Sequence, residues 1–562
     1  DKAIGNDITG NEASASKTVS SEALETETSL PNFRQGDAII LYERNRDTDN
    51  VTNKMVFKGN IEYLTENEIS IRLRATQQNP SVLPAESLYA IEHDTMDTTF
   101  RSMYQGLYIY LSARKERRDL LLSQRPPRFD ESLDSMISRS EDDFTRIALK
   151  AKAAQDYFLL IGPPGTGKTS CALKKMVETF HADKDAQILL LSYTNRAVDE
   201  ICKSLASIAP AVDFIRVGSE LSCDEAYRGH LIENELSSCN RRSEVYERIR
   251  NCRIIVGTVV AISGKPELFC LKHFDVAIID EATQILEPQL LGILCARGED
   301  GKDAIDKFVL IGDHKQLPAV VQQNTEQSAI YDESLLSIGL TNLKDSLFER
   351  LYRNCTATVH RSYDMLCRQG RMHPEVALFA NRAFYGGRLI PVGLPHQIES
   401  SDTICRLAFY PSVPEKAGAS AKINYSEARI VADLAARIYE DHQTDFDESR
   451  TLGIITPYRS QIALIKKEIE SLGIPALNRI LVDTVERFQG SERDVIIYSF
   501  CVNYPYQLKF LSNLTEEEGV LIDRKLNVAL TRARKQMYIT GVSELLERNP
   551  LYKSLLKLIE GS

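Results

Sequence analysis

The chain contains 562 residues, of which 43% are hydrophobic and 26% charged, and it carries a net charge of −11. Its length corresponds to roughly three or four domains, and its composition excludes collagen-like, disulfide-scaffold and wholly disordered proteins. The negative charge argues against a protein that coats nucleic acid by bulk charge neutralisation, but it leaves room for a local basic groove.

Three segments precede the first large domain. Residues 1–32 are rich in Ser, Thr and Glu and are predicted to be a disordered linker. Residues 33–95 contain short runs such as Ile69–Arg74, whose alternation predicts a small β-barrel. A helical pattern then predicts a stalk over residues 96–141, with a basic cluster at Arg114–Arg118 that we interpret mainly as a solvated helix face.

From residue 142 onward, short apolar runs alternate with helical stretches. Runs such as Tyr157–Ile161 are continuous and bounded by polar or turn residues, which is typical of buried parallel strands. A second set of such runs follows, beginning with Leu452–Ile455. The pattern predicts an α/β fold with two tandem parallel-sheet domains, at residues 142–355 and 356–562.

The first motif with a clear chemical meaning follows the run Tyr157–Ile161. Its sequence, Gly-Pro-Pro-Gly-Thr-Gly-Lys-Thr, fits the pattern G-x-x-x-x-G-K-[ST] between an expected strand and an expected helix. In such a loop, backbone N–H groups and the helix N-terminus hold phosphates, Lys168 reaches the β- and γ-phosphates, and the Thr169 hydroxyl binds Mg²⁺. A plain glycine-rich turn needs no Lys-Thr at its end. The predicted nucleotide ligands are Gly162, Pro163, Pro164, Gly165, Thr166, Gly167, Lys168, Thr169 and Ser170.

Two further strand ends carry polar residues suited to phosphate hydrolysis. Asp280 and Glu281 follow an apolar run, so Asp280 is predicted to hold Mg²⁺ and Glu281 to orient and deprotonate the attacking water. Alone, such a pair is equally typical of a helix cap. Gln316 lies in Gly312–Pro318, where its amide can contact both the water and the γ-phosphate.

Hydrolysis also requires positive charge near the γ-phosphate. The second α/β domain offers two candidates for this role, Arg371 and Arg532. Isolated arginines are more often solvated or ion-paired, so sequence alone favours neither strongly. If both reach the nucleotide, we expect ATP binding to hold the two domains closed.

The ordered motifs resemble those of superfamily 1 helicases of the Upf1-like group, and among these the helicase part of Dna2-type proteins. The resemblance runs from about Phe33 to the C-terminus. It rests on the segments Gly162–Thr169, Ser192–Asp199, Val256–Thr258, Asp280–Gln284, Gly312–Pro318, Gln369–Pro374, Thr456–Gln461, Asp483–Glu492 and Leu526–Arg534. It implies two RecA-like domains preceded by a 1B-like barrel and a stalk. It further implies ATP and Mg²⁺ as cofactors and movement along single-stranded nucleic acid, usually 5′ to 3′.

The same resemblance assigns further residues. Lys168, Glu281, Gln316, Arg371 and Arg532 match the catalytic set, Thr169 and Asp280 match the metal-binding pair, and Glu492 matches a contact to the ribose. The implied strand contacts are Thr194, Asn195, Thr258, Pro457, Tyr458 and Thr484. Ordinary capping and turn chemistry is the alternative explanation for the Thr and Asn residues.

Two positions depart from the family pattern. Gly370 stands where the family usually has an aromatic residue able to stack on adenine. Residues 141–152 contain no glutamine of the kind that reads adenine in the family, so selectivity for ATP over other nucleotides stays open. The nuclease domain of Dna2, with its iron–sulfur cluster, has no counterpart here, and we expect any such domain or partner upstream of Asp1.

The remaining signals concern partners and location. The apolar runs fall far short of the roughly 20 residues that span a bilayer. The 11 cysteines include no C-x-x-C pair, which indicates reduced thiols rather than zinc or iron–sulfur ligands. The chain begins at Asp1 without an apolar leader, as a fragment or processed product would. We expect an intracellular protein, cytoplasmic if bacterial, with no membrane partner.

The prediction is therefore an ATP-dependent 5′-to-3′ helicase or translocase on a single strand. The Ser-Tyr-Thr sequence of Ser192–Thr194 and the short connections favour DNA weakly. One alternative is an Upf1-type RNA helicase with the same fold, and another is a nucleic-acid-stimulated ATPase switch that does not unwind. A degenerate scaffold without activity is disfavoured, because the whole catalytic set is present.

Overall fold

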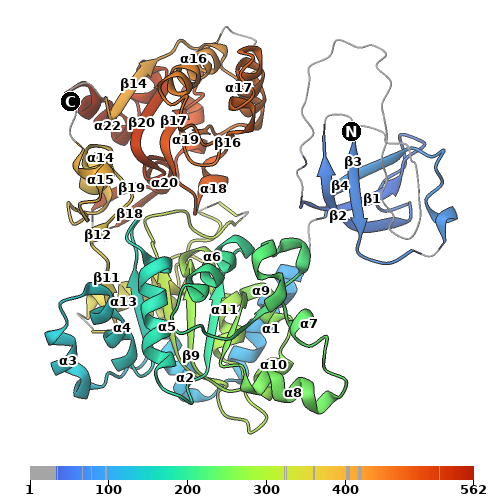
Figure 1. Cartoon of the computed structure of the whole chain (residues 1–562), viewed down its shortest axis with the longest axis vertical. Helices are drawn as coiled ribbons and strands as arrows, with labels where there is room; N and C mark the ends of the chain where they lie inside the picture. The colour runs from blue at the N-terminus through green and yellow to red at the C-terminus, as the bar shows by residue number, and fades with distance from the viewer. Residues whose placement is uncertain are drawn as a thin grey trace. The chain divides into compact units, whose positions relative to one another are not determined.

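The computed structural model divides the chain into two compact units, Asp1–Arg101 and Ser102–Ser562 (Figure 1). The residues it describes are 33, 36–65, 68–77, 79–94, 98–321, 323–324, 326–358, 361–399, 405–415, 420–517 and 519–561. The linker predicted for residues 1–32 lies outside the described residues.

The first unit contains a four-stranded antiparallel sheet with the strand order β3-β2-β1-β4. Its strands are β1 (Ala38–Glu43), β2 (Val56–Leu64), β3 (Ile69–Leu73) and β4 (Tyr89–His93). Alternate residues point inward and form a small core that includes Ile39, Leu41, Ile61, Ile71 and Tyr89. The alternation predicted a small β-barrel, and the described residues form its strands as one antiparallel sheet in which β3 and β4 are the two outer strands.

The stalk helix α1 (Thr98–Ser112) lies against α11 (Glu287–Leu294) at a contact between two glycines. A Cβ atom on Gly106 would lie 2.2 Å from the carbonyl oxygen of Pro288, and one on Gly292 would lie 3.0 Å from the Cα of Gly106. No larger residue fits at either position, so the two backbones are in direct contact.

The basic cluster of the stalk lies around the start of α2 (Lys115–Leu121) and packs against the rest of the second unit. Arg114 and Arg117 both pair with Asp303. Arg117 is only 5% exposed and also donates to the carbonyl of Ile305. The interpretation of this cluster as a solvated face is therefore wrong for Arg117, because the attraction of a buried carboxylate and two carbonyls outweighs its hydration.

A seven-stranded parallel sheet forms the first lobe of the second unit, with the order β11-β5-β10-β9-β6-β8-β7. Its strands are β5 (Tyr157–Ile161), β6 (Ile188–Ser192), β7 (Phe214–Val217), β8 (Ile254–Thr258), β9 (Phe274–Asp280), β10 (Ile305–Gly312) and β11 (Tyr363–Met365). The main helices around it are α4 (Asp143–Ala153), α5 (Lys174–His181), α6 (Asn195–Ala206), α8 (Arg242–Asn251), α9 (Val259–Ser263), α10 (Glu267–Leu271) and α13 (Leu347–Ala357). Two apolar cores lie on opposite faces of the sheet.

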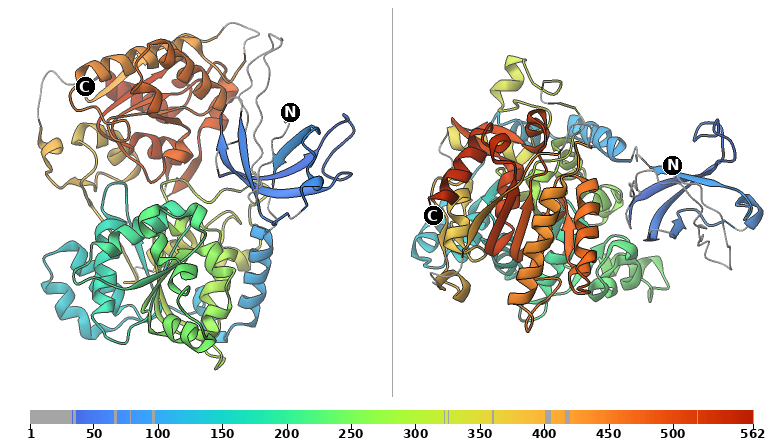
Figure 2. Two further views of the ribbon diagram at one scale, coloured as in Figure 1. Left: turned by 45° about the vertical axis from the view of Figure 1, so that its right-hand side comes forward. Right: turned by 90° about the horizontal axis from the view of Figure 1, so that it is seen from above.

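The second lobe is built on a five-stranded parallel sheet with the order β14-β20-β17-β15-β16. Its strands are β14 (Leu407–Pro411), β15 (Leu452–Ile455), β16 (Leu481–Asp483), β17 (Arg493–Ser499) and β20 (Ala533–Gly541). Its main helices are α14 (Pro374–Phe384), α16 (Tyr425–Asp441), α17 (Arg459–Ser471), α18 (Val485–Phe488), α19 (Leu508–Leu511), α20 (Arg524–Leu530) and α22 (Pro550–Glu560). Helices lie on both sides of each sheet in Figure 2, as the predicted α/β fold requires.

Smaller elements connect these parts. They are α3 (Asp134–Arg139), α7 (Ile232–Glu235), α12 (Glu333–Ser337), α15 (Pro395–Ile398), α21 (Ser543–Leu546), the short pair β12 (Arg368–Gln369) and β13 (Ile390–Pro391), and the hairpin β18 (Leu514–Glu517) and β19 (Val520–Asp523). Strand β11 pairs with β5, so the first sheet takes its last strand from beyond residue 356. No helix in the described part of the chain is long and apolar enough to cross a membrane.

Candidate nucleotide site and nucleic-acid interface

The glycine-rich loop predicted to bind phosphates connects β5 to the helical turn Lys168–Leu173. Gly165 and Gly167 have φ angles of +73° and +75°, a left-handed conformation that favours glycine. A Cβ on Gly165 would lie 2.4 Å from the Cβ of Arg371, and the N–H of Gly370 donates to the carbonyl of Gly165 at 2.8 Å. The second lobe therefore touches the loop directly, at a position where only glycine fits.

The two acidic residues at the end of β9, Asp280 within the strand and Glu281 just after it, meet the loop. The Nζ atom of Lys168 lies 2.6 Å from Oε1 of Glu281, and the Thr169 hydroxyl donates to Oδ2 of Asp280. Burial alone would lower the pKa of Lys168, but the carboxylates of Glu281 and Asp280 outweigh burial and raise it. Burial likewise favours a raised pKa for Glu281, and Lys168 outweighs it and lowers that pKa. Lys168 and Glu281 therefore form a charged pair.

Thr169 and Asp280 supply the oxygen atoms that Mg²⁺ prefers. Their contacting atoms are a hydroxyl and a carboxylate oxygen, the donor pair that holds Mg²⁺ in P-loop proteins. Asp280 is 1% exposed, and burial together with the neighbouring Glu281 raises its pKa to about 6. A buried carboxylate that lacks a cation of its own is suited to a divalent ion, so the residues present fit the predicted metal.

Gln316 lies at the junction of the two lobes, in the turn after β10. Its Nε2 donates to Oδ2 of Asp313 at 2.8 Å, and its Oε1 lies 3.5 Å from Nη2 of Arg532. The side chain is 5% exposed. This predicted catalytic glutamine thus contacts a predicted arginine finger from the other lobe.

The two predicted arginine fingers differ in their partners. Arg371 pairs with Glu492 at 2.5 Å, so a candidate finger and the predicted ribose contact lie side by side. Arg532 is 2% exposed and donates to the carbonyls of Val528 and Ser491, and no carboxylate in the described part of the chain forms an ion pair with it. Burial and the nearby Arg371 lower the pKa of Arg532 to about 9. Arg532 is therefore a buried cation available to an anionic ligand.

Sequence reasoning missed a buried hydrogen-bond chain between the lobes. The hydroxyl of Tyr385, just after α14, donates to Oδ2 of Asp313 at 2.7 Å. Asn527 of α20 donates through Nδ2 to the Tyr385 hydroxyl at 2.8 Å and to the carbonyl of Lys315 at 2.7 Å. The chain connects the turn that carries Gln316 to the helix that precedes Arg532. No local pattern around Tyr385 marks it, because its partner lies 72 residues away.

Two ion pairs also connect the lobes. Arg524, at the start of α20, pairs with Glu349 of α13, and both side chains are buried. Glu517, in the hairpin strand β18, lies 3.1 Å from Nε2 of His314. Neither pair was predicted. The two members of each pair lie far apart in the sequence, 175 residues for Arg524 and Glu349, so pattern reading does not find them.

The predicted strand contacts of the first lobe lie at the carboxyl ends of β6 and β8. Thr194 and Thr258 are the N-caps of α6 and α9, and their hydroxyls accept hydrogen bonds from Ala197 and Ala261. Asn195 is the first residue of α6. The capping alternative therefore accounts for both hydroxyls in this structure, and contact with a strand stays a prediction.

The predicted strand contacts of the second lobe lie at the matching ends of β15 and β16. Pro457 and Tyr458 precede α17, and Thr484 is the N-cap residue of α18. The Tyr458 hydroxyl accepts a hydrogen bond from Nε2 of Gln507 at 3.1 Å. Parallel strands put all these residues at one edge of each sheet, as binding to one strand would require.

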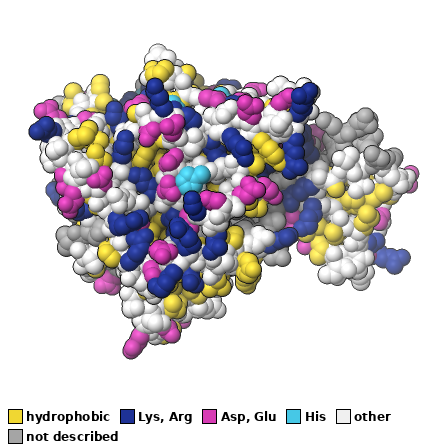
Figure 3. All heavy atoms as spheres, turned by 90° about the horizontal axis from the view of Figure 1, so that it is seen from below, with side chains coloured by type: hydrophobic (Ala, Val, Ile, Leu, Met, Phe, Trp, Pro, Cys, Tyr) yellow, Lys and Arg dark blue, Asp and Glu magenta, His cyan; other side chains and the backbone are white. Residues whose placement is uncertain are grey.

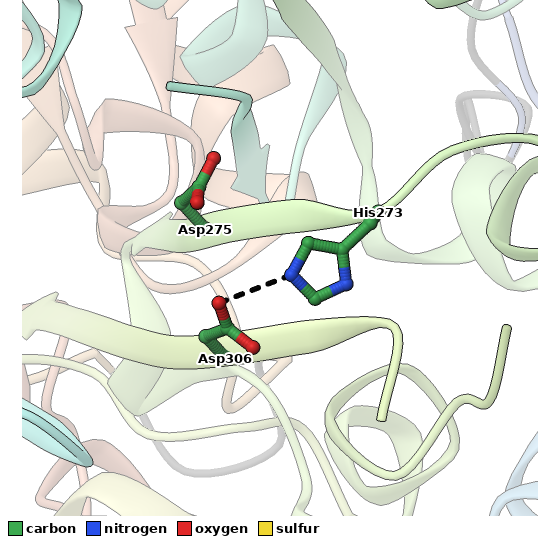
Figure 4. A group of neighbouring side chains, drawn as sticks. All are labelled: His273, Asp275 and Asp306. Atoms are coloured by element: carbon green, nitrogen blue, oxygen red, sulfur yellow. Dashed lines mark ion pairs between the residues drawn. The ribbon is translucent and has the colours of Figure 1, made fainter. Parts of the chain in front are cut away.

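The opposite edge of the first sheet carries another group of potential metal ligands. His273, Asp275 and Asp306 lie together there, as Figure 4 shows. His273 Nε2 lies 3.0 Å from Oδ2 of Asp306, and Asp275 accepts from the N–H of Gln187 at 2.6 Å. The surface at this end, seen in Figure 3, carries Lys and Arg interspersed with Asp and Glu. An exposed ion pair accounts for this group, which is separate from the nucleotide site.

Comparisons with known proteins match both lobes. A family model described as an AAA domain matches residues 139–245 and 233–324, and a second model with that description matches residues 343–544. The chain is 28% identical to the DNA replication ATP-dependent helicase/nuclease JHS1 of Arabidopsis thaliana, over 94% of the chain and 38% of that protein. It is 27% identical to the DNA replication ATP-dependent helicase/nuclease DNA2 of Bos taurus, over 94% of the chain and 49% of that protein.

A third relative is matched over more of its own length. The DNA polymerase alpha-associated DNA helicase A of Saccharomyces cerevisiae is 24% identical, over 82% of the chain and 73% of that protein. By contrast, the chain spans less than half the length of each of the two helicase/nucleases. The residues matched by the two family models include every motif segment from Gly162–Thr169 to Leu526–Arg534.

Proposed function

We propose that this chain, which belongs to the Upf1-like group of superfamily 1 helicases, couples ATP hydrolysis to 5′-to-3′ movement along single-stranded DNA. The first lobe would act as the 1A domain and the second as the 2A domain. The names of the relatives, which refer to DNA replication and DNA helicases, support DNA as the strand. A nuclease domain or partner beyond this chain is part of the same proposal.

The observation that carries the proposal is the meeting of both lobes at the phosphate-binding loop. Lys168, Asp280 and Glu281 come from the first lobe, whereas Arg371 and Arg532 come from the second. Arg371 lies against Gly165, and Arg532 lies beside Gln316. A nucleotide in this position would contact both lobes, so its binding and loss would change how firmly they are held together.

The charges of the site supply a sequence of events for hydrolysis. Phosphate oxygens would attract Lys168 away from Glu281, and burial would then raise the pKa of Glu281 and make it a better base. Glu281 would take a proton from the attacking water, which Gln316 orients. Arg532 would meet the charge that develops on the γ-phosphate. Mg²⁺ held by Thr169 and Asp280 would neutralise charge on the β- and γ-phosphates.

The first experiment measures steady-state ATP hydrolysis without nucleic acid, with single-stranded DNA and with single-stranded RNA of the same sequence, at one salt concentration. Strong stimulation by DNA is expected. Equal or greater stimulation by RNA would support an Upf1-type RNA helicase instead. Absence of stimulation by either strand would contradict the proposal. The Glu281→Gln variant, which should bind ATP and not hydrolyse it, controls for contaminating ATPases.

A second experiment tests movement and its direction. Duplexes with a 5′ tail should be unwound faster than duplexes with a 3′ tail. The reverse preference would contradict the proposed polarity. Stimulated hydrolysis without strand displacement on either substrate would indicate an ATPase switch.

Adding GTP in place of ATP tests whether Gly370 and the missing glutamine relax nucleotide selectivity.

A further inference from the structure

An exposed aromatic cluster follows β17, in a segment to which the proposed function gives no role. Tyr506 is 55% exposed and Phe510 is 71% exposed. The ring of Tyr504 lies nearly parallel to that of Tyr506, with centroids 5.7 Å apart and an angle of 14° between the planes. Aromatic side chains usually bury most of their surface in a core, so two exposed rings one helical turn apart indicate a binding surface.

The segment that carries these rings is firmly anchored. Gln507 is 2% exposed, and its Oε1 accepts from the N–H groups of Asn503 and Tyr504 at 2.9 Å each. Its Nε2 donates to the carbonyl of Ala421 at 2.8 Å. Leu508 and Leu511 are buried in the core of the second lobe. The turn from 505 to 511 therefore buries one side and presents Tyr506 and Phe510 on the other.

This surface adjoins a predicted strand contact. The same Nε2 atom of Gln507 donates to the hydroxyl of Tyr458 at 3.1 Å. Asn503 donates to the carbonyl of Ile423, so the loop before α16 also packs here and brings Tyr425, which is 46% exposed. Aromatic rings thus continue from Tyr458 onto the segment after β17.

The charge of the surface favours an anionic occupant. The three stretches that meet here, residues 421–425, 457–460 and 503–511, contain three exposed cations and no acidic residue. The adjoining Glu415 accepts from the backbone N–H of Tyr425 at 2.6 Å, so the cations outnumber the acids here. The cations are Lys422, Arg459 and Lys509. Rings flanked by cations are how proteins hold single-stranded nucleic acid, since bases stack on the rings and phosphates contact the charges. A purely apolar protein partner would gain nothing from these cations.

We propose that Tyr506 and Phe510 form a stacking platform for bases of the single strand that passes Tyr458. The inference rests on the proposed function and extends it, because it adds a base-binding site on the segment after β17 that includes α19. Stacking on an aromatic ring depends little on base identity. The platform would therefore strengthen binding to any sequence and would hold the strand against the second lobe.

The absence of tryptophan from the sequence allows a direct test. The Tyr506→Trp variant contains a single tryptophan, whose fluorescence is quenched when a base stacks on it. Saturable quenching is expected with a single-stranded oligothymidylate, and little or none with an abasic strand of equal length and charge. The matched control is Tyr246→Trp on α8, whose last turn accepts a hydrogen bond from Lys272 just before β9, at the edge of the first sheet opposite the predicted strand contacts. Quenching at position 506 that does not exceed the control would overturn the proposal.

A second measurement tests whether the rings matter for binding. The Tyr506→Ala and Phe510→Ala double variant should lower single-strand affinity by about 5- to 150-fold for each base that loses its stacking partner. It should also raise the strand concentration that half-stimulates ATP hydrolysis, while the basal and the fully stimulated rates stay unchanged. Tyr506→Phe should keep the affinity. Unchanged affinity in a double variant that melts at the wild-type temperature would refute the platform.

Measurements on the wild-type protein distinguish a failure of the stacking platform from a failure of the proposed function. If the wild-type protein binds single strands and is stimulated by them but the variants behave like the wild type, the platform is wrong and the proposed function stands. If the wild-type protein neither binds a strand nor responds to one, the proposed function is wrong and the platform falls with it.

Discussion

The two parallel sheets of the second unit carry different chemistry at the same kind of edge. After β5, β9 and β10, the first sheet places a lysine, a threonine and buried acids around the phosphate-binding loop. The second lobe brings arginines to that loop and lacks a comparable loop of its own in its described residues. Neither lobe holds the whole predicted catalytic set, so the proposed hydrolysis would require both.

The arrangement of charge also differs between the lobes. In the first lobe, Lys168 and Glu281 neutralise one another before any ligand arrives. In the second lobe, Arg532 has only carbonyl, hydroxyl and amide partners among the described residues. The difference suggests a division of labour, in which the first lobe binds the nucleotide and the second responds to its γ-phosphate.

The largest effect on ATP turnover is expected in the first lobe, to which we assign nucleotide binding. Replacing Lys168 with alanine should reduce ATP turnover by more than about 10³-fold, because the loop loses the charge that reaches the phosphates. Single-strand binding, measured by fluorescence anisotropy, should persist. Lys175→Ala on the neighbouring helix, whose side chain pairs with Glu178 at the surface, is the control. Full activity in Lys168→Ala would contradict the assignment of nucleotide binding to the first lobe.

The next largest effect is expected in the second lobe, to which we assign the response to the γ-phosphate. Arg532→Lys should bind a fluorescent ATP analogue almost as well as the wild type but hydrolyse ATP about 10³-fold more slowly, because a lysine cannot reproduce the planar fork of the guanidinium. Arg534→Lys, two residues away, keeps a charge beside both Asp494 and Glu492 and should have little effect. Loss of nucleotide binding without loss of the chemical step would contradict the assigned role.

A pH effect follows from a buried acid that belongs to the second lobe alone. Glu427 of α16 is fully buried and accepts from the Ser499 hydroxyl at 2.6 Å and the Cys501 N–H at 2.8 Å. Unlike Glu281, it forms no ion pair in the described part of the chain, and burial raises its pKa to about 7. Its protonated form therefore stabilises the fold below about pH 4.5, and this contribution is lost as the pH rises through 7.

Denaturant unfolding of Glu427→Gln against the wild type measures that contribution. Glutamine keeps the shape and cannot ionise. The difference in unfolding free energy should shift in favour of the variant by about 3 kcal/mol between pH 4.5 and pH 8. A difference that does not change with pH would mean that the carboxyl group is ionised throughout.

The smallest effect concerns the hydrogen-bond chain between the lobes. Tyr385→Phe removes the hydroxyl that joins Asp313 to Asn527 and should cost about 1–2 kcal/mol of unfolding free energy. It should also lower strand-stimulated hydrolysis several-fold with little change in ATP affinity. Tyr552→Phe, whose buried hydroxyl donates to Asp523 within the second lobe, should cost similar stability and leave stimulation intact. If both variants lose stimulation equally, the Tyr385 hydroxyl has no specific role in linking strand binding to ATP hydrolysis.

The amino-acid pattern was sufficient for the α/β fold and for the order of the motifs. Apolar runs such as Tyr157–Ile161 are strands buried on both faces, and such strands leave a strong signal in a single sequence. The position of Lys168 beside Glu281 could be anticipated, because adjacent parallel strands bring their carboxyl ends together. The contacts between the lobes could not, since Tyr385 finds Asp313 only through tertiary packing. For the same reason the burial of Arg117 was missed in a run of charges.

The glycine contact between α1 and α11 has a mechanical consequence. Because the two backbones touch at Gly106, even an alanine at this position would force the stalk away from α11. Helix α11 begins six residues after Glu281, so α1 is fastened close to the reaction centre. Any movement of α11 would therefore be passed directly to the part of α1 that touches it.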